Sequence, residues 1–234
     1  GWSPETINSI VPGGWSIAVE FSFYMIAPVM FRSLSSLKIS IVAFIICLFA
    51  GKIISYYVFQ TVSLIYPESQ HYLIKAFSFF LFTTQLPVFI LGIMPYHLLK
   101  LHPTACKEVS LSLLILSLFL FLGFLDSNVI PKHISYSLSF VIFSLSLAYY
   151  PYKIFVNPLI MFIGKLSFSI YLSHFMVIYA LQSFFSEGVV PVGDGELLPW
   201  YLVVLLLSSV VSFFTYTFIE VPGMRLGSKI ISKL

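Results

Sequence analysis

A stretch of apolar sequence at residues 14–28 contains side chains that are able to do chemistry. Ser16, Glu20 and Tyr24 recur every four residues, so they line one stripe of a helix, and Trp15 stands at its start. Burying a carboxylate in a membrane costs on the order of 3 kcal/mol, so a Glu in such a segment is by default a functional-site hypothesis. Its chemistry would be to orient a histidine or to bind a substrate hydroxyl.

Three other apolar stretches carry polar residues of the same kind. Ser167, Tyr171 and His174 share a helical face at i, i+4 and i+7, and Lys52 is a candidate partner for Glu20. The last stripe, at four-residue steps, consists of Ser208, Ser212, Tyr216 and Glu220. A histidine can act as a base, and hydroxyl or ammonium donors can stabilise an oxyanion.

Each of these residues also has a structural interpretation. Serines in membrane helices often only bond a neighbouring helix or their own backbone. His174 can be a neutral imidazole that bonds one hydroxyl, Lys52 can reach toward lipid headgroups, and Glu20 can be a simple interfacial residue. The polar stripes alone therefore do not define a site.

The elements that position these residues follow from composition. Of the 234 residues, 59% are hydrophobic and only 9% are charged, with a mean hydropathy of +1.00. These values indicate an all-α, polytopic transmembrane helix bundle that forms a single membrane domain over residues 1–234. The continuously apolar run at residues 111–122 argues against a β-barrel. We expect about seven spans, at residues 15–32, 39–59, 76–99, 108–125, 134–150, 159–184 and 199–220.

The basic residues predict the orientation of these spans, because short cytoplasmic loops are enriched in Lys and Arg. One set of span ends holds Arg32, Lys38, Lys100, Lys107, Lys153, Lys165, Arg225, Lys229 and Lys233. The opposite ends hold only Lys75 and Lys132. We therefore expect the amino end outside, the carboxyl end in the cytoplasm, and Glu20, Lys52 and His174 in the outer half.

The same distribution limits the possible partners. The basic residues are scattered singly, so the net charge of +3 predicts no nucleic-acid site. Cys47 and Cys106 show neither metal-ligand spacing nor a disulfide framework, and no metal site is predicted. Lys100, Lys153, Lys165 and Arg225 can either meet the phosphates of a coenzyme or only reflect the inward bias of positive charge.

Three motifs together resemble the acyltransferase 3 family of multi-pass membrane acyltransferases. Residues 14–28 are similar to its Trp-Ser-x-x-x-Glu-x-x-Phe-Tyr-x-x-x-Pro signature. Residues 162–174 resemble its Gly-x-x-Ser-Tyr-x-x-Tyr-Leu-x-His segment, with Phe168 in place of the usual Tyr. Residues 218–222, Phe-Ile-Glu-Val-Pro, resemble its closing Glu-x-Pro element. The motifs keep the family's order and approximate spacing, so the resemblance extends over essentially the whole chain.

The resemblance implies an O-acyltransferase of the cell envelope, in the bacterial inner or plasma membrane. It would transfer an acyl group, most often acetyl from acetyl-CoA, onto a sugar hydroxyl of a surface or secreted polysaccharide such as lipopolysaccharide. Its partners would be membrane lipid, the carbohydrate acceptor and the coenzyme A thioester, with no bound cofactor. The family's earlier spans carry an arginine and an essential histidine that this chain lacks. We therefore expect a carboxyl-terminal part of the domain, inactive alone, with the main catalytic histidine upstream.

Within this chain, the candidate catalytic residues are Glu20 and His174, both in supporting roles. The candidate substrate-binding residues are Trp15, Ser16, Tyr24, Lys52, Tyr171 and Glu220. Two other classes remain open: a transporter or flippase, in which Pro87 would break the third span, and a non-catalytic membrane scaffold. The sequence shows no repeat between its first and last three spans, which disfavours the transporter.

Overall fold

The structure, a computed structural model, describes residues 3–6, 13–123, 130–185 and 194–232. Throughout these residues the regular secondary structure is helical, and no strand occurs in them. The chain divides into two compact units, Gly1–Pro151 and Tyr152–Leu234, which are described separately below. The predicted all-α class is therefore confirmed.

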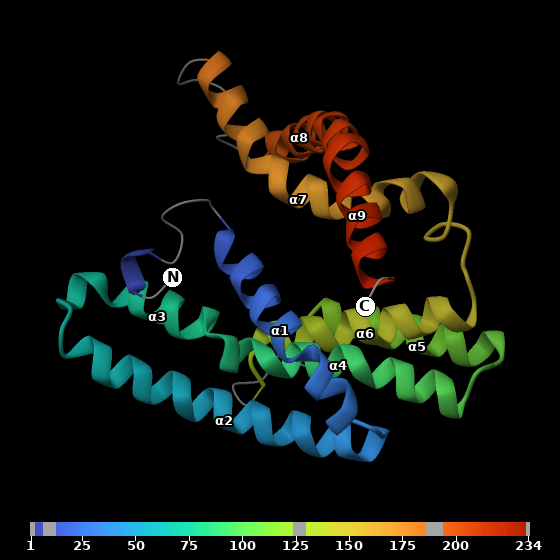
Figure 1. The fold of residues 1–234 in the computed structure, drawn as a ribbon, viewed down its shortest axis with the longest axis horizontal. Coiled ribbons are helices and arrows are strands. Elements are labelled where there is room, and N and C mark those ends of the chain that lie inside the picture. Colours follow the sequence, from blue (N-terminus) through green and yellow to red (C-terminus); the bar gives the residue numbers. More distant parts are fainter. Residues whose placement is uncertain (1–2, 7–12, 124–129, 186–193, 233–234) are drawn as a thin grey trace. The chain divides into compact units, whose positions relative to one another are not determined.

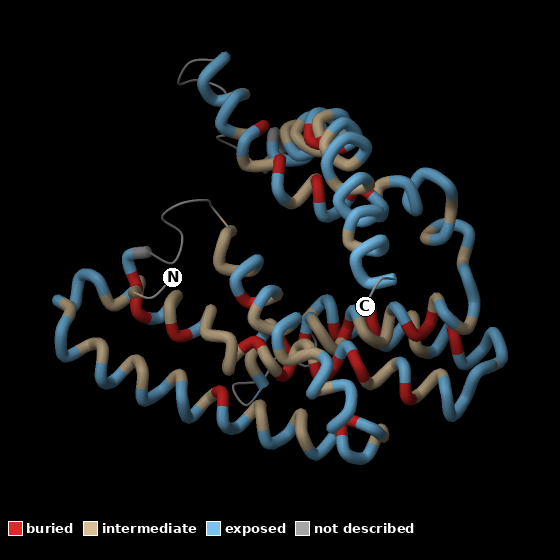
Figure 2. Tube along the Cα trace, viewed as in Figure 1, coloured by how far each residue is buried: buried red, intermediate tan, exposed pale blue. Residues whose placement is uncertain are grey.

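The first unit is a bundle in which long helices pack in pairs. Helix α2 packs along α4, and α5 packs along α6, which also contacts α4 (Figure 1). Its elements are η1 (Pro4–Thr6), α1 (Gly14–Ser33), α2 (Leu37–Ser63), η2 (Glu68–Gln70), α3 (His71–Phe80), α4 (Phe82–Leu101), α5 (Lys107–Phe121) and α6 (Lys132–Tyr149). Figure 2 shows buried positions along these helices where they face one another and exposed positions on their outer sides.

Helix α1 contacts α3 and α4 through one aromatic face. The Trp15 ring stacks on Phe80, with 3.9 Å between centroids, and the Phe23 ring stacks on Phe89 at 4.2 Å. Val19 lies between them in sequence at the same four-residue spacing and is buried. The stripe of Ser16, Glu20 and Tyr24 is therefore turned about 100° from the packed face.

The third predicted span, residues 76–99, is two helices, and the predicted break at Pro87 is wrong. The chain leaves the helical conformation at Leu81, with φ −58° and ψ 140°, whereas α4 runs straight through Pro87. The break leaves carbonyl groups without helical partners. The Thr84 hydroxyl donates to the carbonyl of residue 78 at 3.0 Å, and the buried Gln85 amide donates to that of residue 79 at 2.7 Å. These two side-chain bonds satisfy backbone carbonyl groups that water could not reach inside a membrane.

A glycine allows α2 to approach this break closely. A Cβ atom on the buried Gly51 would lie 2.8 Å from the Thr83 carbonyl oxygen, too close for any larger residue without a shift. Gly51 precedes Lys52, so this contact also determines where the Lys52 side chain leaves α2.

Buried serines join α5 to α6. The Ser110 hydroxyl donates to the Ser146 carbonyl at 2.9 Å, and the Ser146 hydroxyl donates back to the Ser110 carbonyl at 2.7 Å. Seven residues away on each helix, the Ser139 hydroxyl donates to the Ser117 carbonyl at 2.7 Å. Small residues that bond across helices are the usual means of packing in lipid, so these serines are structural.

The second unit contains a helical hairpin followed by a further helix. Its elements are α7 (Pro158–Phe185), α8 (Asp194–Thr215), the π-helical η3 (Tyr216–Glu220) and α9 (Val221–Ile231). Helix α7 packs along α8 and also contacts η3. The last span was expected to end at residue 220, but the chain stays helical, and α9 continues from η3 in a new direction (Figure 1).

Five helical stretches of the described chain are long and apolar enough to cross a membrane. They are Gly14–Ser33, Leu37–Ser63, Glu68–Leu101, Pro158–Phe184 and Leu197–Ile231. The stretches predicted at 108–125 and 134–150 are helical but are not among these five. With 15 residues, α5 is shorter than the about 20 needed to cross a bilayer. Residues 124–125 of the first stretch, and Lys233, lie outside the described residues.

Candidate functional site

The second unit brings two of the three family-like segments into direct contact. The Ser169 hydroxyl donates to the Glu220 carboxylate oxygen Oε2 at 2.8 Å. One turn further along α7, the Ser173 and Ser212 hydroxyls lie 2.9 Å apart and share a hydrogen bond. We call Ser169, Ser173, Ser208, Ser212 and Glu220 the serine–glutamate row. All four serines are buried, so the row is a polar seam between α7 and the α8–η3 helix.

The π-helical turn brings Glu220 onto this seam. In a regular α-helix, the side chain eight residues after Ser212 would point about 80° away from the direction of Ser212. The wider turn over residues 216–220, closed by a bond from the Val221 amide to the Tyr216 carbonyl, takes up an additional residue. Glu220 is thereby returned toward α7. Pro222 favours this irregular turn, because it has no amide hydrogen to donate to a preceding carbonyl.

His174 lies one residue beyond the row on α7 and is held by its own helix. Its Nδ1 atom lies 2.7 Å from the Tyr171 carbonyl oxygen and 3.3 Å from that of Ile170. A carbonyl oxygen can only accept, so Nδ1 carries the hydrogen and the neutral ring keeps a lone pair on Nε2. The Tyr171 ring, whose centroid is 5.7 Å from that of His174, lies beside it. This tautomer can take a proton from a hydroxyl group through Nε2.

The residues predicted on α1 lie in the first unit. Glu20 is half-buried, and Tyr24 is 65% exposed. The Ser16 hydroxyl donates to the Gly13 carbonyl at 3.2 Å at the start of the helix. Gly13 adopts a left-handed conformation, with φ 75°, that favours glycine.

The predicted ion pair between Glu20 and Lys52 is not formed. Within the described part of the chain, Glu20 has neither an ion-pair nor a hydrogen-bond partner. Lys52 instead lines a cavity next to the α3–α4 break. This cavity has a volume of about 710 Å³ and lies among α2, α3, α4 and the start of α6. Its lining consists of Lys52, Ser55, Tyr56, Phe59, Lys75, Ser78, Phe79, Thr84, Pro131, Lys132, His133 and Tyr136.

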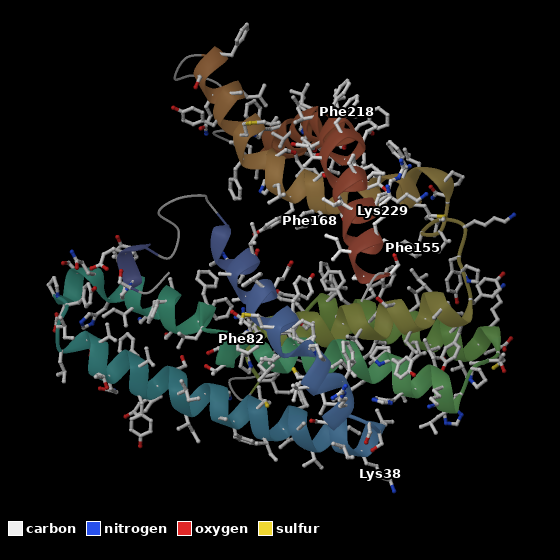
Figure 3. The ribbon with its side chains drawn as sticks, in the orientation of Figure 1. Lys38, Phe82, Phe155, Phe168, Phe218 and Lys229 are labelled. Atoms are coloured by element: carbon white, nitrogen blue, oxygen red, sulfur yellow. The ribbon has the colours of Figure 1, made fainter. Side chains whose placement is uncertain are left out.

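Sequence reasoning missed two members of the row. It selected Ser167 on α7, which is exposed, whereas the seam is formed by Ser169 and Ser173. Their four-residue spacing matches that of Ser208 and Ser212 on the facing helix, and this match was the available signal. Phe168 and Phe218, labelled in Figure 3, are exposed and take no part in the seam.

A buried histidine outside the motifs was also missed. His97 Nε2 lies 2.8 Å from the Leu34 carbonyl oxygen and ties the end of α4 to the turn between α1 and α2. Its role is structural. Within the described residues, no group of three or more His, Cys, Asp or Glu side chains is placed to hold a metal ion.

These features are those of a multi-pass membrane protein with a polar seam between α7 and the α8–η3 helix, and the chain belongs to the acyltransferase 3 family. The family model described as an acyltransferase domain matches residues 2–217. The chain is 30% identical over 236 residues to a Staphylococcus aureus (strain COL) protein named "Putative O-acetyltransferase SACOL0978". It is 26% identical over 232 residues to O-acetyltransferase OatA of Staphylococcus aureus (strain NCTC 8325 / PS 47).

The two alignments cover 93% and 92% of this chain but only 37% and 36% of those relatives. The chain thus spans little more than a third of the length of the curated relatives it matches. No solved structure matches the chain.

Proposed function

We propose that this chain is part of a membrane O-acyltransferase that moves an acetyl group from acetyl-CoA onto a sugar hydroxyl of a cell-surface or secreted polysaccharide. The membrane would be the bacterial inner or plasma membrane. One observation carries the proposal beyond family membership: the Ser169–Glu220 hydrogen bond joins two family-like segments that lie about fifty residues apart. Their contact supports a shared role for the two segments in positioning the residues of α7.

The chemistry of O-acyl transfer is compatible with the residues of the second unit. A base removes the proton from the acceptor hydroxyl, and the oxygen attacks the thioester carbonyl. The carbon–sulfur bond then breaks, and the thiolate takes up a proton to leave as a thiol. His174 is suited to support the proton transfer through Nε2, because its Nδ1 hydrogen is already donated to the Tyr171 carbonyl. Tyr171 can donate to the oxyanion that develops on the carbonyl oxygen.

Glu220 acts as a positioning residue in this proposal. Its carboxylate accepts a hydrogen bond from Ser169, which lies five residues before His174 on α7, and thereby ties η3 to α7. Such a bond fixes the helix on which Tyr171 and His174 stand. Trp15, Ser16, Glu20 and Tyr24 belong to the first unit. We propose that Glu20 orients a histidine or binds an acceptor hydroxyl.

Acetyl content of the polysaccharide tests the proposal in cells. A strain producing the full-length protein should release acetate on mild alkaline treatment of its envelope polysaccharide, and a deletion strain should not. Glu20→Gln should abolish this acetate while the protein is still inserted and expressed. Normal acetylation by Glu20→Gln would exclude a role for the carboxylate. Uptake of a labelled sugar without any acetylated product would instead favour a transporter.

A further inference from the structure

The last apolar stretch of the described chain is too long to be one membrane span. Leu197–Ile231 comprises 35 residues, so as a continuous helix it would measure about 52 Å, whereas the hydrocarbon core is about 30 Å thick. A tilt of about 40°, at the upper end of what membrane helices adopt, would still leave a depth of about 40 Å. Residues 197–220 alone measure about 36 Å and suffice to cross the core. The residues of α9 are therefore not needed inside it.

The chain changes direction where this span is complete. The π-helical η3 ends at Glu220, and α9 leaves it in a new direction (Figure 1). Pro222 lies in the first turn of α9, where proline can start a helix without the loss of a hydrogen bond. Within the described residues, α9 makes its main contacts with η3, and all its residues except Val221 and Gly227 are exposed. It is therefore a separate helix that its own unit leaves largely uncovered.

The side chains of α9 are sorted onto two faces. From residue 223 onward, at 100° per residue, the apolar residues and the two glycines fall in an arc of about 160°. This apolar face consists of Gly223, Met224, Leu226, Gly227, Ile230 and Ile231. Its large side chains are each more than half exposed. Arg225, Ser228 and Lys229 lie together on the opposite side, and α9 contains no Asp or Glu. The helix is therefore amphipathic and positively charged.

This distribution of charge selects an anionic lipid surface as the partner of α9. A helix with one apolar and one basic face is suited to lie in the membrane interface, with apolar side chains among the acyl chains and basic ones at the headgroups. The membrane surface is also within reach, because α9 begins where the preceding span leaves the hydrocarbon core. The charge pattern of the chain predicts this span end in the cytoplasm, and the cytoplasmic leaflet is anionic.

We propose that α9 is an interfacial helix that docks on the anionic surface of the cytoplasmic leaflet. Its apolar face enters the lipid, and Arg225 and Lys229 lie at the phosphates of the headgroups. Because α9 continues directly from η3, this docking holds the turn that carries Glu220 at the edge of the membrane. The inference goes beyond the proposed function and does not depend on it, since docking on lipid requires no acyl transfer.

The accessibility of spin labels tests the position of α9. The full-length protein, with its other cysteines replaced by alanine, is labelled singly at Leu226, Ile230, Ser228 or Ser232 and reconstituted in vesicles of phosphatidylcholine and phosphatidylglycerol. Labels at Leu226 and Ile230 should collide with oxygen, which concentrates in lipid. Labels at the two serines should collide with a water-soluble nickel chelate.

Three patterns of accessibility would overturn the proposal. Collision with oxygen on both faces would show that α9 continues the membrane span. Collision with the nickel chelate on both faces would place α9 in water. Shielding of the labels from both reagents would show that α9 packs against protein.

Removal of charge tests the anionic partner. Arg225→Gln and Lys229→Gln should each lower the ratio of docked to undocked label at Leu226 about fivefold, because each basic residue near an anionic surface contributes a free energy of that size. Lys229→Arg should keep the wild-type ratio. Lys153→Gln, at an exposed lysine of the same unit outside α9, is the matched control and should also keep it.

Two further probes make the result specific to lipid headgroups. Vesicles of phosphatidylcholine alone should lower the docked ratio of the wild type, as should high salt, which screens exposed charges. Equal docking in both lipid mixtures, or an unchanged ratio with the double variant Arg225→Gln/Lys229→Gln, would overturn the proposal. Release of the label by added coenzyme A, equally in both mixtures, would assign the basic face to that ligand and would overturn it as well.

Discussion

The hydrogen bond between Ser169 and Glu220 makes a quantitative prediction. Its 2.8 Å distance and carboxylate acceptor are those of hydrogen bonds to charged groups, which contribute about 1.5–3 kcal/mol. Ser169 is 5% exposed, but Glu220 is only half-buried, so water competes for the carboxylate. We therefore expect the lower part of that range, about 1.5–2 kcal/mol, as the coupling between the two side chains.

A double-mutant cycle measures this coupling. Ser169→Ala, Glu220→Ala and the double variant are unfolded reversibly in mixed detergent micelles, and the three losses in unfolding free energy are compared. The matched control replaces Ser183, an exposed serine of α7, in combination with Glu220→Ala. That control pair should be additive within about 0.5 kcal/mol. If the free-energy losses of Ser169→Ala and Glu220→Ala also add within this margin, the contact is refuted, and with it the attachment of η3 to α7.

Three further predictions concern other features of the chain. Gly51→Ala should destabilise the protein by about 1–3 kcal/mol, because its Cβ would overlap the backbone of the α3–α4 break. Gly92→Ala, where nothing lies within 4 Å, should not, and equal losses would refute the close packing. Ser208→Ala should leave the unfolding free energy unchanged or raise it, because the buried hydroxyl has no hydrogen-bond partner among the described residues; a loss above about 1 kcal/mol would contradict this. Tyr66→Phe should raise the pKa of Glu5 toward 4.5, because the Tyr66 hydrogen bond is the largest cause of its lowering. The Tyr66–Glu5 hydrogen bond stabilises the folded state above the unfolded pKa of Glu5, and this stabilisation is lost as pH falls through the lower folded pKa. An unchanged carbon-13 titration of Glu5 in the Tyr66→Phe variant would refute the bond.

Much of the fold was predictable because lipid imposes a simple rule on the chain. Long apolar runs must be helical to satisfy their backbone, so the positions of the helices follow from hydropathy. The stripe of Ser208, Ser212 and Glu220 was also predictable from its period. Beyond Ser212, however, the chain forms a π-helical turn, which no regular helical period predicts. Tyr216 was therefore included in the stripe only because it fell on the four-residue step.

The break at Leu81 was not predictable from local sequence. Leucine is a good helix former, and Pro87 was the more obvious breaker. The deciding groups are side chains: Thr84 and Gln85 bond carbonyls six residues earlier, and such bonds form only once the chain has already turned. Pro87 is tolerated within the buried α4 helix because neighbouring packing compensates for one missing hydrogen bond.

The candidate site was predictable in part. The sequence motifs singled out His174 and Glu220, which lie in the same unit, but Glu220 bonds α7 through Ser169 rather than through the predicted Ser167. Which serine faces α8 depends on the rotation of α7, and polar periodicity alone did not determine it. The expected pairing of Glu20 with Lys52 rested on membrane depth, which says nothing about which face of each helix carries the charge.

The most direct test of the central claim is transfer of labelled acetyl from acetyl-CoA to polysaccharide by the full-length protein reconstituted in lipid vesicles. The wild type should produce labelled glycan, and His174→Gln, which keeps a polar side chain but cannot act as a base, should slow the transfer by about a hundredfold or more. Ser183→Ala should retain the wild-type rate. Absence of labelled glycan with the wild type, or an unchanged rate with His174→Gln, would contradict the account.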